Sequence, residues 1–277
     1  MRVLLQDQLL NRDEVAIDIE DRGYQFGDGV YEVMRVYEGQ LFTINEHLER
    51  LARSADQIRM KLPLRLDVLK ERLIELVSEN SVQNGAVYVQ VSRGVSLRNH
   101  SFPGDKVTPV LIAYPLPGKK PAQEQQNGVQ VNLVDDMRWL RCDIKSLNLL
   151  WNVMAKQEAL DKGTYEALLH RDGTITEGSS TNFYAVKDGT VYTHPANNLI
   201  LNGITRMKII ELCSENGIPF MEKELYINER TSFDEAFISS TTIEIVPVTK
   251  IEEDVIGEGK PGEVTKRLQE LFRKITP

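Results

Sequence analysis

One lysine in this chain of 277 residues has surroundings that suit covalent chemistry. Lys145 lies between Ile144 and Leu147, just before a predicted helix. An amine that is desolvated by apolar neighbours is less readily protonated, so its lone pair can attack a carbonyl carbon. Most lysines are solvated surface residues, and taken alone Lys145 would be one of them. The segment therefore indicates a Schiff-base lysine only if the rest of the chain holds a carbonyl compound.

A carboxylate and three runs of small polar residues form a second candidate group. Glu177 precedes the small residues at 178–182, the residues at 202–206 open a predicted helix, and Ser239–Thr242 end a predicted strand. Helix starts and clustered backbone N–H groups bind phosphate, although each run alone is more often a cap or a turn. Together they predict a phosphate cradle with a carboxylate beside it.

Cationic and aromatic side chains in the first half of the chain suit the binding of a small anion. Arg98 and His100 lie in a predicted loop, where they could bring two cationic donors to one carboxylate. Arg50 projects from a predicted helix, and Tyr31 follows a stretch with three glycines. A surface ion pair for Arg50, a core aromatic for Tyr31 and a solvated loop for Arg98 remain the alternatives.

Other patterns exclude several classes. Gly257, Gly259 and Gly262 match a dinucleotide fingerprint, but too few residues follow for a βαβ unit, so we predict a surface loop there. The formal charge of −8 is spread along the chain, which argues against nucleic acid and anionic membranes as partners. Cys142 and Cys213 lack the spacing of a disulfide framework or a metal site, so we expect two buried thiols, no metal and a cytoplasmic location.

The elements that must position these residues are helices mixed with short strands. In the first half we predict a hairpin of 30–37 and 40–43, a helix from about Asn45, a helix over 66–77, and strands over 87–91 and 107–114. Thr43 and Glu46 have the spacing of a capping box for the first helix.

The second half combines strands with three inserted helices. Strands are predicted at 129–133, 165–170, 182–186 and 190–193, and helices at about 148–163, 204–216 and 263–275. Asp-Gly turns join several strands, so we expect an antiparallel sheet. The fold class is α+β or mixed α/β, with a smaller N-terminal α/β domain over 1–118, a linker over 119–126 and a larger C-terminal domain over 127–277.

Three stretches resemble the fold-type IV enzymes that depend on pyridoxal 5′-phosphate, and within them the D-amino-acid aminotransferases. These stretches are Asp21–Glu32, Trp139–Asn148 and Thr176–Ser180, and the likeness runs essentially from end to end. The resemblance implies a two-domain fold with the cofactor bound by the C-terminal domain.

The resemblance also implies roles for single residues. Lys145 would bond to the cofactor and move the proton between the substrate Cα and the cofactor. Glu177 would face the pyridine nitrogen and keep the ring protonated. The phosphate would be held by Arg50, Ile204, Thr205 and Thr241, with Leu201 against the ring. Tyr31, Arg98 and His100 would hold the substrate carboxylate, the last two from the neighbouring subunit of a homodimer.

The implied reaction passes the amino group of a D-amino acid, D-alanine first, to 2-oxoglutarate in a ping-pong sequence that yields pyruvate and D-glutamate, a cell-wall precursor. Branched-chain L-amino-acid aminotransferase and aminodeoxychorismate lyase are the alternatives, because both share the lysine and the glutamate. The pair Arg98 and His100 favours the D-amino acid. Trp151 and Ile243 depart from the expected pattern, so the range of amino donors stays open.

Overall fold

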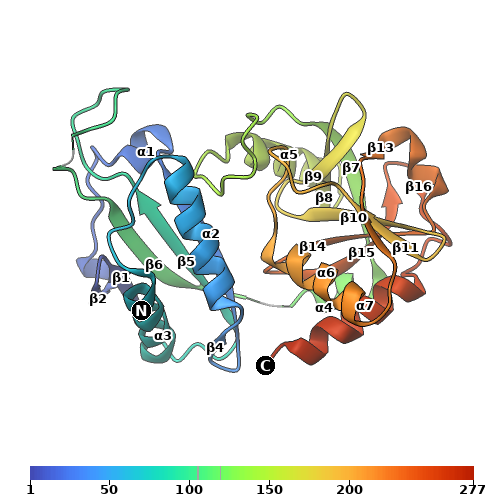
Figure 1. The fold of residues 1–277 in the computed structure, drawn as a ribbon, viewed down its shortest axis with the longest axis horizontal. Coiled ribbons are helices and arrows are strands. Elements are labelled where there is room, and N and C mark those ends of the chain that lie inside the picture. Colours follow the sequence, from blue (N-terminus) through green and yellow to red (C-terminus); the bar gives the residue numbers. More distant parts are fainter. Residues whose placement is uncertain (105, 119) are drawn as a thin grey trace. The chain divides into compact units, whose positions relative to one another are not determined.

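The computed structural model describes residues 1–104, 106–118 and 120–277, and the chain forms two compact units (Figure 1). The first unit comprises Met1–Lys119, Ile144–Asn148 and Pro277, and the second comprises Lys120–Asp143 and Leu149–Thr276. Lys119, the first residue of the predicted linker, lies outside the described residues. Most of the remaining linker forms helix α4 (Ala122–Asn127), which belongs to the second unit.

The first unit contains an antiparallel sheet with strand order β2-β1-β6-β5-β3-β4. Its strands are β1 (Arg2–Leu5), β2 (Gln8–Asn11), β3 (Gly29–Tyr37), β4 (Gln40–Leu41), β5 (Gly85–Ser92) and β6 (Val110–Pro117). The hairpin of β3 and β4 confirms the prediction, whereas β6 begins later than predicted and continues to Pro117. The helical elements are η1 (Arg12–Glu14), α1 (Arg22–Phe26), α2 (Ile44–Gln57) and α3 (Leu66–Glu79).

The core of the first unit lies between the sheet and the helices α2 and α3, which both cover one face (Figure 1). Successive side chains of a strand point to opposite faces, so Val30, Met34 and Val36 of β3 enter this core. The Glu32 side chain points to the same face of the sheet as these residues and is therefore buried against α2. Tyr31 lies on the opposite face, where its ring contacts that of Tyr88.

The predicted capping box at the start of α2 is wrong, although the helix itself is confirmed. Thr43 precedes the helix with φ of 52°, and its side chain makes no cap hydrogen bond. Its hydroxyl instead donates to the Phe42 carbonyl at 2.7 Å. Most of the stability of such a helix comes from packing its apolar face, so a missing cap is tolerated.

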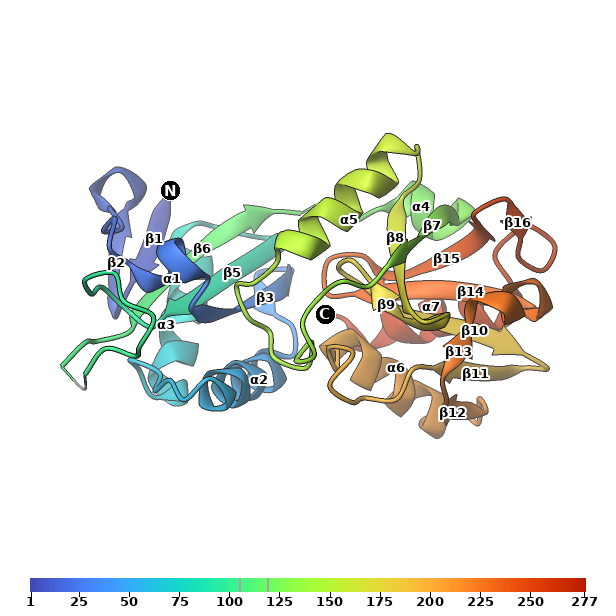
Figure 2. The ribbon, with the colours of Figure 1, turned by 90° about the horizontal axis from the view of Figure 1, so that it is seen from above.

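The second unit is built on a ten-stranded sheet with order β12-β11-β10-β14-β15-β7-β8-β9-β13, and β16 pairs with β15. Its strands are β7 (Val129–Asp135), β8 (Glu166–Arg171), β9 (Thr174–Gly178), β10 (Asn182–Lys187), β11 (Thr190–Thr193), β12 (Phe220–Glu222), β13 (Leu225–Tyr226), β14 (Glu235–Ser240), β15 (Glu244–Ile251) and β16 (Asp254–Val255). The prediction of an antiparallel sheet is wrong for β7, which is parallel to both β8 and β15, and for β11, which is parallel to β12. Helix α5 (Leu150–Asp161) makes the crossover from β7 to β8, which a parallel pair requires (Figure 2).

Apolar side chains from most of these strands meet in one core, among them Val131, Phe183 and Val246. Helix α5 packs on β8 through Ala155 and Ala159, while α6 (Ile204–Glu215) and α7 (Glu263–Ile275) pack on each other and against β14. A short 3-10 helix, η2 (Ile227–Ser232), follows β13. Within the described residues, none of the helices has both the length and the apolarity that crossing a membrane requires.

Candidate active site

Lys145 is held against strand β3 in the first unit. Ser146 forms a bridge with Val30, and the Tyr31 N–H donates to the Lys145 carbonyl at 3.0 Å. The lysine is half-buried, and its Nζ lies 4.2 Å from the centre of the Tyr31 ring. The structure therefore brings two predicted site residues, Lys145 and Tyr31, into direct contact.

Gly29, the first residue of β3, occupies a position that leaves no room for a side chain. A Cβ at this position would lie 2.5 Å from the Val91 carbonyl oxygen and 2.8 Å from Cδ1 of Leu147. Any larger residue would push the segment that carries Lys145 away from the strand. Gly29, in the stretch Asp21–Glu32, thus allows the close approach that sets the position of Lys145, in the stretch Trp139–Asn148.

Arg50 forms a buried ion pair with Glu32. Its Nε donates to Glu32 Oε1 at 2.7 Å and its Nη2 to Oε2 at 2.9 Å, while His47 Nδ1 lies 2.7 Å from the same Oε2. Burial alone would raise the pKa of Glu32, but the charge and hydrogen bonds of Arg50, with help from His47, lower it to about 2. Burial also lowers the pKa of His47 below its ordinary value. The pairing fixes the direction of the Arg50 guanidinium.

Arg98 and His100 lie together on the loop between β5 and β6. Both contact the Phe26 ring: the Arg98 guanidinium carbon lies 4.4 Å from its centre, and the His100 ring centre lies 5.6 Å away. Both side chains are exposed. Two adjacent donors of this kind can bind one carboxylate.

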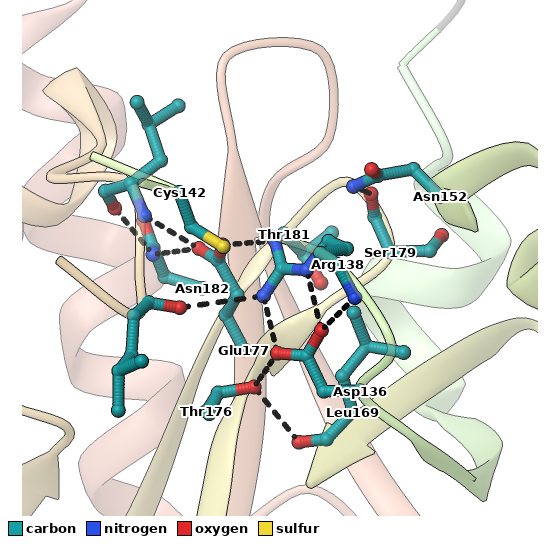
Figure 3. Close-up of polar contacts among 12 residues, drawn as sticks. Asp136, Arg138, Cys142, Asn152, Leu169, Thr176, Glu177, Ser179, Thr181 and Asn182 are labelled. Carbon is teal, nitrogen blue, oxygen red and sulfur yellow. Dashed lines mark hydrogen bonds and ion pairs between the residues drawn. The ribbon is translucent and has the colours of Figure 1, made fainter. Parts of the chain in front are cut away.

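Glu177 is the centre of a buried polar network in the second unit (Figure 3). Its Oε1 accepts from Arg138 Nη1 at 2.6 Å, and its Oε2 accepts from Asn182 Nδ2 at 3.0 Å and from the Leu201 backbone N–H at 3.1 Å. Burial raises the pKa of Glu177 above its ordinary value, against the lowering effects of Arg138 and the Leu201 N–H. These three donors therefore hold the Glu177 carboxylate in a fixed orientation beside Leu201.

Arg138 is shared between two carboxylates. Besides Glu177 it donates to Asp136, from Nε at 2.9 Å and from Nη2 at 2.8 Å (Figure 3). Asp136 also accepts from Arg171 Nε at 3.2 Å and from the Thr176 hydroxyl at 3.0 Å. Although burial acts in the opposite direction, Arg138 keeps the pKa of Asp136 below its ordinary value.

The predicted phosphate ligands of the second unit lie at neighbouring element ends. Ile204 and Thr205 form the first turn of α6, preceded by Gly203, which has no side chain to cap the helix. A Cβ on Gly203 would lie 2.2 Å from Asn182 Oδ1, so the helix start lies directly against the residue that donates to Glu177. Asn182 pairs with Ser239 near the end of β14, and half-buried Thr241 lies in the turn that follows.

The two residues that depart from the family pattern are partly buried and pack against the cores of the second unit. Trp151 packs against the cluster beneath α5 and donates its indole N–H to the Asp135 carbonyl at 3.0 Å. Ile243 packs against the main core.

Several residues of these networks did not emerge from the sequence as site residues: Glu32, His47, Asp136, Arg138 and Asn182. Glu32 is the last residue of the family-like stretch Asp21–Glu32, and Asn182 follows the stretch Thr176–Ser180 by two positions. Asp136 and Arg138 follow an apolar strand directly, and two opposite charges at a strand end are a signal that could have identified them. His47 gives no such signal, because its role depends on the register of α2 against β3.

Comparisons with known proteins agree on one family. The model of the amino-transferase class IV family matches residues 29–251. A curated D-alanine aminotransferase from Bacillus licheniformis is 53% identical over 269 residues, which cover 97% of this chain and 95% of that protein.

Solved structures share the fold at lower identity. The branched-chain amino acid aminotransferase of Escherichia coli superposes with a TM-score of 0.93 at 26% identity, covering 99% of this chain and 93% of that one. The 4-amino-4-deoxychorismate lyase of Pseudomonas aeruginosa gives 0.86 at 25% identity, covering 98% of each chain. The fold is thus common to proteins named for different reactions.

Proposed function

Since the chain belongs to the class IV aminotransferase family, we propose that it transfers the amino group of a D-amino acid to a 2-oxo acid. The first pair of substrates is D-alanine and 2-oxoglutarate, and the products are pyruvate and D-glutamate. The observation that carries this proposal is the 53% identity to the D-alanine aminotransferase over nearly the full length of both chains.

A side-by-side assay tests the reaction. We expect pyruvate from D-alanine only when 2-oxoglutarate is present, and much slower transfer from L-leucine. Transfer that favours L-leucine would instead support a branched-chain aminotransferase. Release of pyruvate from aminodeoxychorismate without a 2-oxo acid would support the lyase. Likeness of fold does not separate these reactions, whereas the assay does.

Pyridoxal 5′-phosphate fits the chemistry of the residues present. When bound, the cofactor accepts the electron pair left behind as the substrate Cα loses its proton. Arg50, the first turn of α6 at Ile204 and Thr205, and Thr241 would hold its phosphate, because helix starts and guanidinium groups bind phosphate oxygens. The half-buried Leu201, whose backbone N–H is bonded to Glu177, would pack on the ring.

Glu177 would hold the proton at the pyridine nitrogen. Its carboxylate is orientated by three N–H donors, so it is preorganised and need not be ordered during the reaction. Its raised pKa also suits a group that shares a proton with a ring nitrogen.

Lys145 would bind the cofactor aldehyde through Nζ and, once released, move the proton at the substrate Cα. The backbone bond from Tyr31 and the ring contact at 4.2 Å support a fixed position for this amine. Borohydride reduction of the cofactor-loaded enzyme should attach the label to a peptide that contains Lys145. A label on any other lysine would rule out this assignment.

A second copy of the chain would complete the substrate site. Tyr31, Arg98 and His100 would bind the substrate carboxylate, with the last two supplied by the partner. Apolar side chains exposed on α5 support a homodimer: Leu150 is 75% exposed, Val153 62% and Leu160 55%.

Subunit complementation tests this arrangement. Lys145→Ala and Arg98→Ala chains should each be almost inactive at low substrate concentration. When they are co-expressed, each hybrid dimer has one intact site, so an equal mixture should recover about one quarter of wild-type activity. No recovery in hybrids verified by mass spectrometry would mean that Arg98 acts within its own chain.

We further propose that the enzyme is cytoplasmic and that its product D-glutamate serves cell-wall synthesis. Cys142 and Cys213 are both buried free thiols, as in proteins of reducing compartments, which supports a cytoplasmic enzyme. D-glutamate belongs to the precursors of the bacterial cell wall. Growth of a strain that lacks other sources of D-glutamate, rescued by this chain but not by its Lys145→Ala variant, would test that use.

A further inference from the structure

The loop that carries Arg98 and His100 is attached to the rest of the first unit by side chains of α1. Backbone bonds join the loop near its start, where the Arg22 N–H donates to the Gly94 carbonyl and the Ser96 N–H donates to that of Glu20. Further along, Arg22 Nη1 donates to the Asn99 carbonyl at 2.6 Å. Asn99 stands between Arg98 and His100, so this bond fixes the backbone that carries both.

The Phe26 ring is surrounded by three cationic or titratable side chains. Arg98 and His100 contact it from the loop, and the Arg22 guanidinium carbon lies 4.8 Å from its centre. An aromatic ring attracts such groups through its quadrupole, most strongly arginine. A long, exposed arginine otherwise samples many rotamers, and ordering it has an entropic cost.

Arg22 and Phe26 are themselves held firmly. Arg22 is buried, and its Nε donates at 2.8 Å to Asp28, which also accepts from Arg93 Nε at 2.8 Å. Helix α1 ends at Phe26 and is followed by Gly27, whose φ of 65° is a conformation that favours glycine. The turn therefore presents Phe26 and Arg22 from a rigid base.

We propose that Phe26 and Arg22 are positioning residues that orientate Arg98 and His100 toward a single substrate carboxylate. The inference rests on the proposed function, because it takes these two side chains as the carboxylate ligands. It adds a role for part of the Asp21–Glu32 stretch that the cofactor chemistry leaves unexplained. All of these contacts lie within the first unit of one chain. They are therefore the same whether the loop contributes to the active site of its own subunit or to that of the partner.

The expected effect is on substrate affinity. Cation–π contacts at exposed sites are each worth a few-fold in affinity, so Phe26→Leu should raise KM about fivefold. Both substrates carry a carboxylate, so the KM values for D-alanine and 2-oxoglutarate should rise together. The value of kcat should stay within about twofold, as expected when uniform substrate binding is weakened. Phe26→Trp keeps an aromatic face and should restore most of the affinity.

Tyr24→Leu is the matched control. It removes an aromatic ring from the same short helix, but Tyr24 is 82% exposed. Its KM values should equal those of the wild type. Arg98→Ala sets the scale of the effect, with a KM rise of at least about tenfold. Phe26→Leu in the Arg98→Ala background should add less than it does alone, because one of its two loop partners is already absent.

Each outcome has a defined meaning. If Arg98→Ala raises KM and Phe26→Leu behaves like Tyr24→Leu, the positioning role is wrong and the proposed function stands. If Arg98→Ala leaves both KM values unchanged, the carboxylate-binding role fails and the positioning role fails with it. If Phe26→Leu lowers kcat and Tm while both KM values stay fixed, Phe26 serves only the stability of the fold, which also overturns the inference.

Discussion

Each unit buries one glutamate against an arginine, and the two pairs have opposite electrostatic outcomes. Glu32 in the first unit has a pKa lowered to about 2, whereas the pKa of Glu177 in the second is raised. Both side chains are buried, so desolvation acts on both in the same direction. The difference must therefore come from their partners.

The partners differ in how many carboxylates they serve. Arg50 forms a two-bond pair with Glu32, and His47 adds a third contact. Arg138 divides its hydrogen bonds between Glu177 and Asp136, and the Asp136 charge raises the pKa of Glu177 further. An arginine that serves one acid fixes it as an anion, whereas a shared arginine leaves the acid able to exchange a proton. The first arrangement suits a pair that fixes the direction of the Arg50 guanidinium, and the second suits a group that faces a ring nitrogen.

The strongest test of the contrast between Glu32 and Glu177 is to remove Arg138, the arginine shared by Glu177 and Asp136. Arg138→Met should lower the free energy of unfolding by about 3–5 kcal/mol, because it leaves Glu177 and Asp136 buried without their common partner. Denaturant unfolding of the cofactor-free protein measures the change. Arg141→Met is the matched control, since Arg141 pairs with Asp143 at the surface and its loss should have an effect of at most about 1 kcal/mol. Equal effects of the two substitutions would refute the shared role.

The acid stability of the protein tests the Glu32 pair. The pKa of Glu32 is lowered on folding, so its contribution is fully present above its ordinary pKa of 4.5 and is lost as pH falls toward about 2. The loss should be of order 3 kcal/mol, seen as a steep fall in the free energy of unfolding below pH 4.5. Glu32→Gln should flatten this fall. An unchanged slope in that variant would show that other carboxylates dominate.

Glu177→Gln tests whether the buried carboxylate of Glu177 serves the chemistry. The amide keeps most of the shape but does not hold a proton at the ring nitrogen, so kcat should fall about a hundredfold. Single-turnover absorbance of the loaded enzyme measures the chemical step directly. Glu177→Asp, which keeps the charge, should lose less. If Glu32→Gln lowered the same step as strongly, the contrast between the two glutamates would not hold.

The sequence predicted most of the helices and strands and several site residues. The features that it did not predict have physical reasons. Regular periodicity located helices such as Leu66–Glu79 and Glu263–Ile275, because one apolar face must enter a core. The parallel placement of β7 did not follow from the sequence, since strand order depends on contacts far apart in the chain. The same limit applies to Arg138. Its charge was visible beside Asp136, but its bond to Glu177 joins residues 39 positions apart.

The smallest predicted effect refines the role of Asp136. Its charge raises the pKa of Glu177, so Asp136→Asn should lower that pKa by leaving Arg138 to Glu177 alone. The carboxylate then stays ionised to lower pH, and the acid limb of the kcat profile should move down by less than about one pH unit. Asp135→Asn provides the control, because the neighbouring Asp135 side chain is 81% exposed and should leave the profile in place. A shift toward higher pH in Asp136→Asn would mean that Asp136 assists ionisation of Glu177, and the sharing of Arg138 would then not explain the contrast with Glu32.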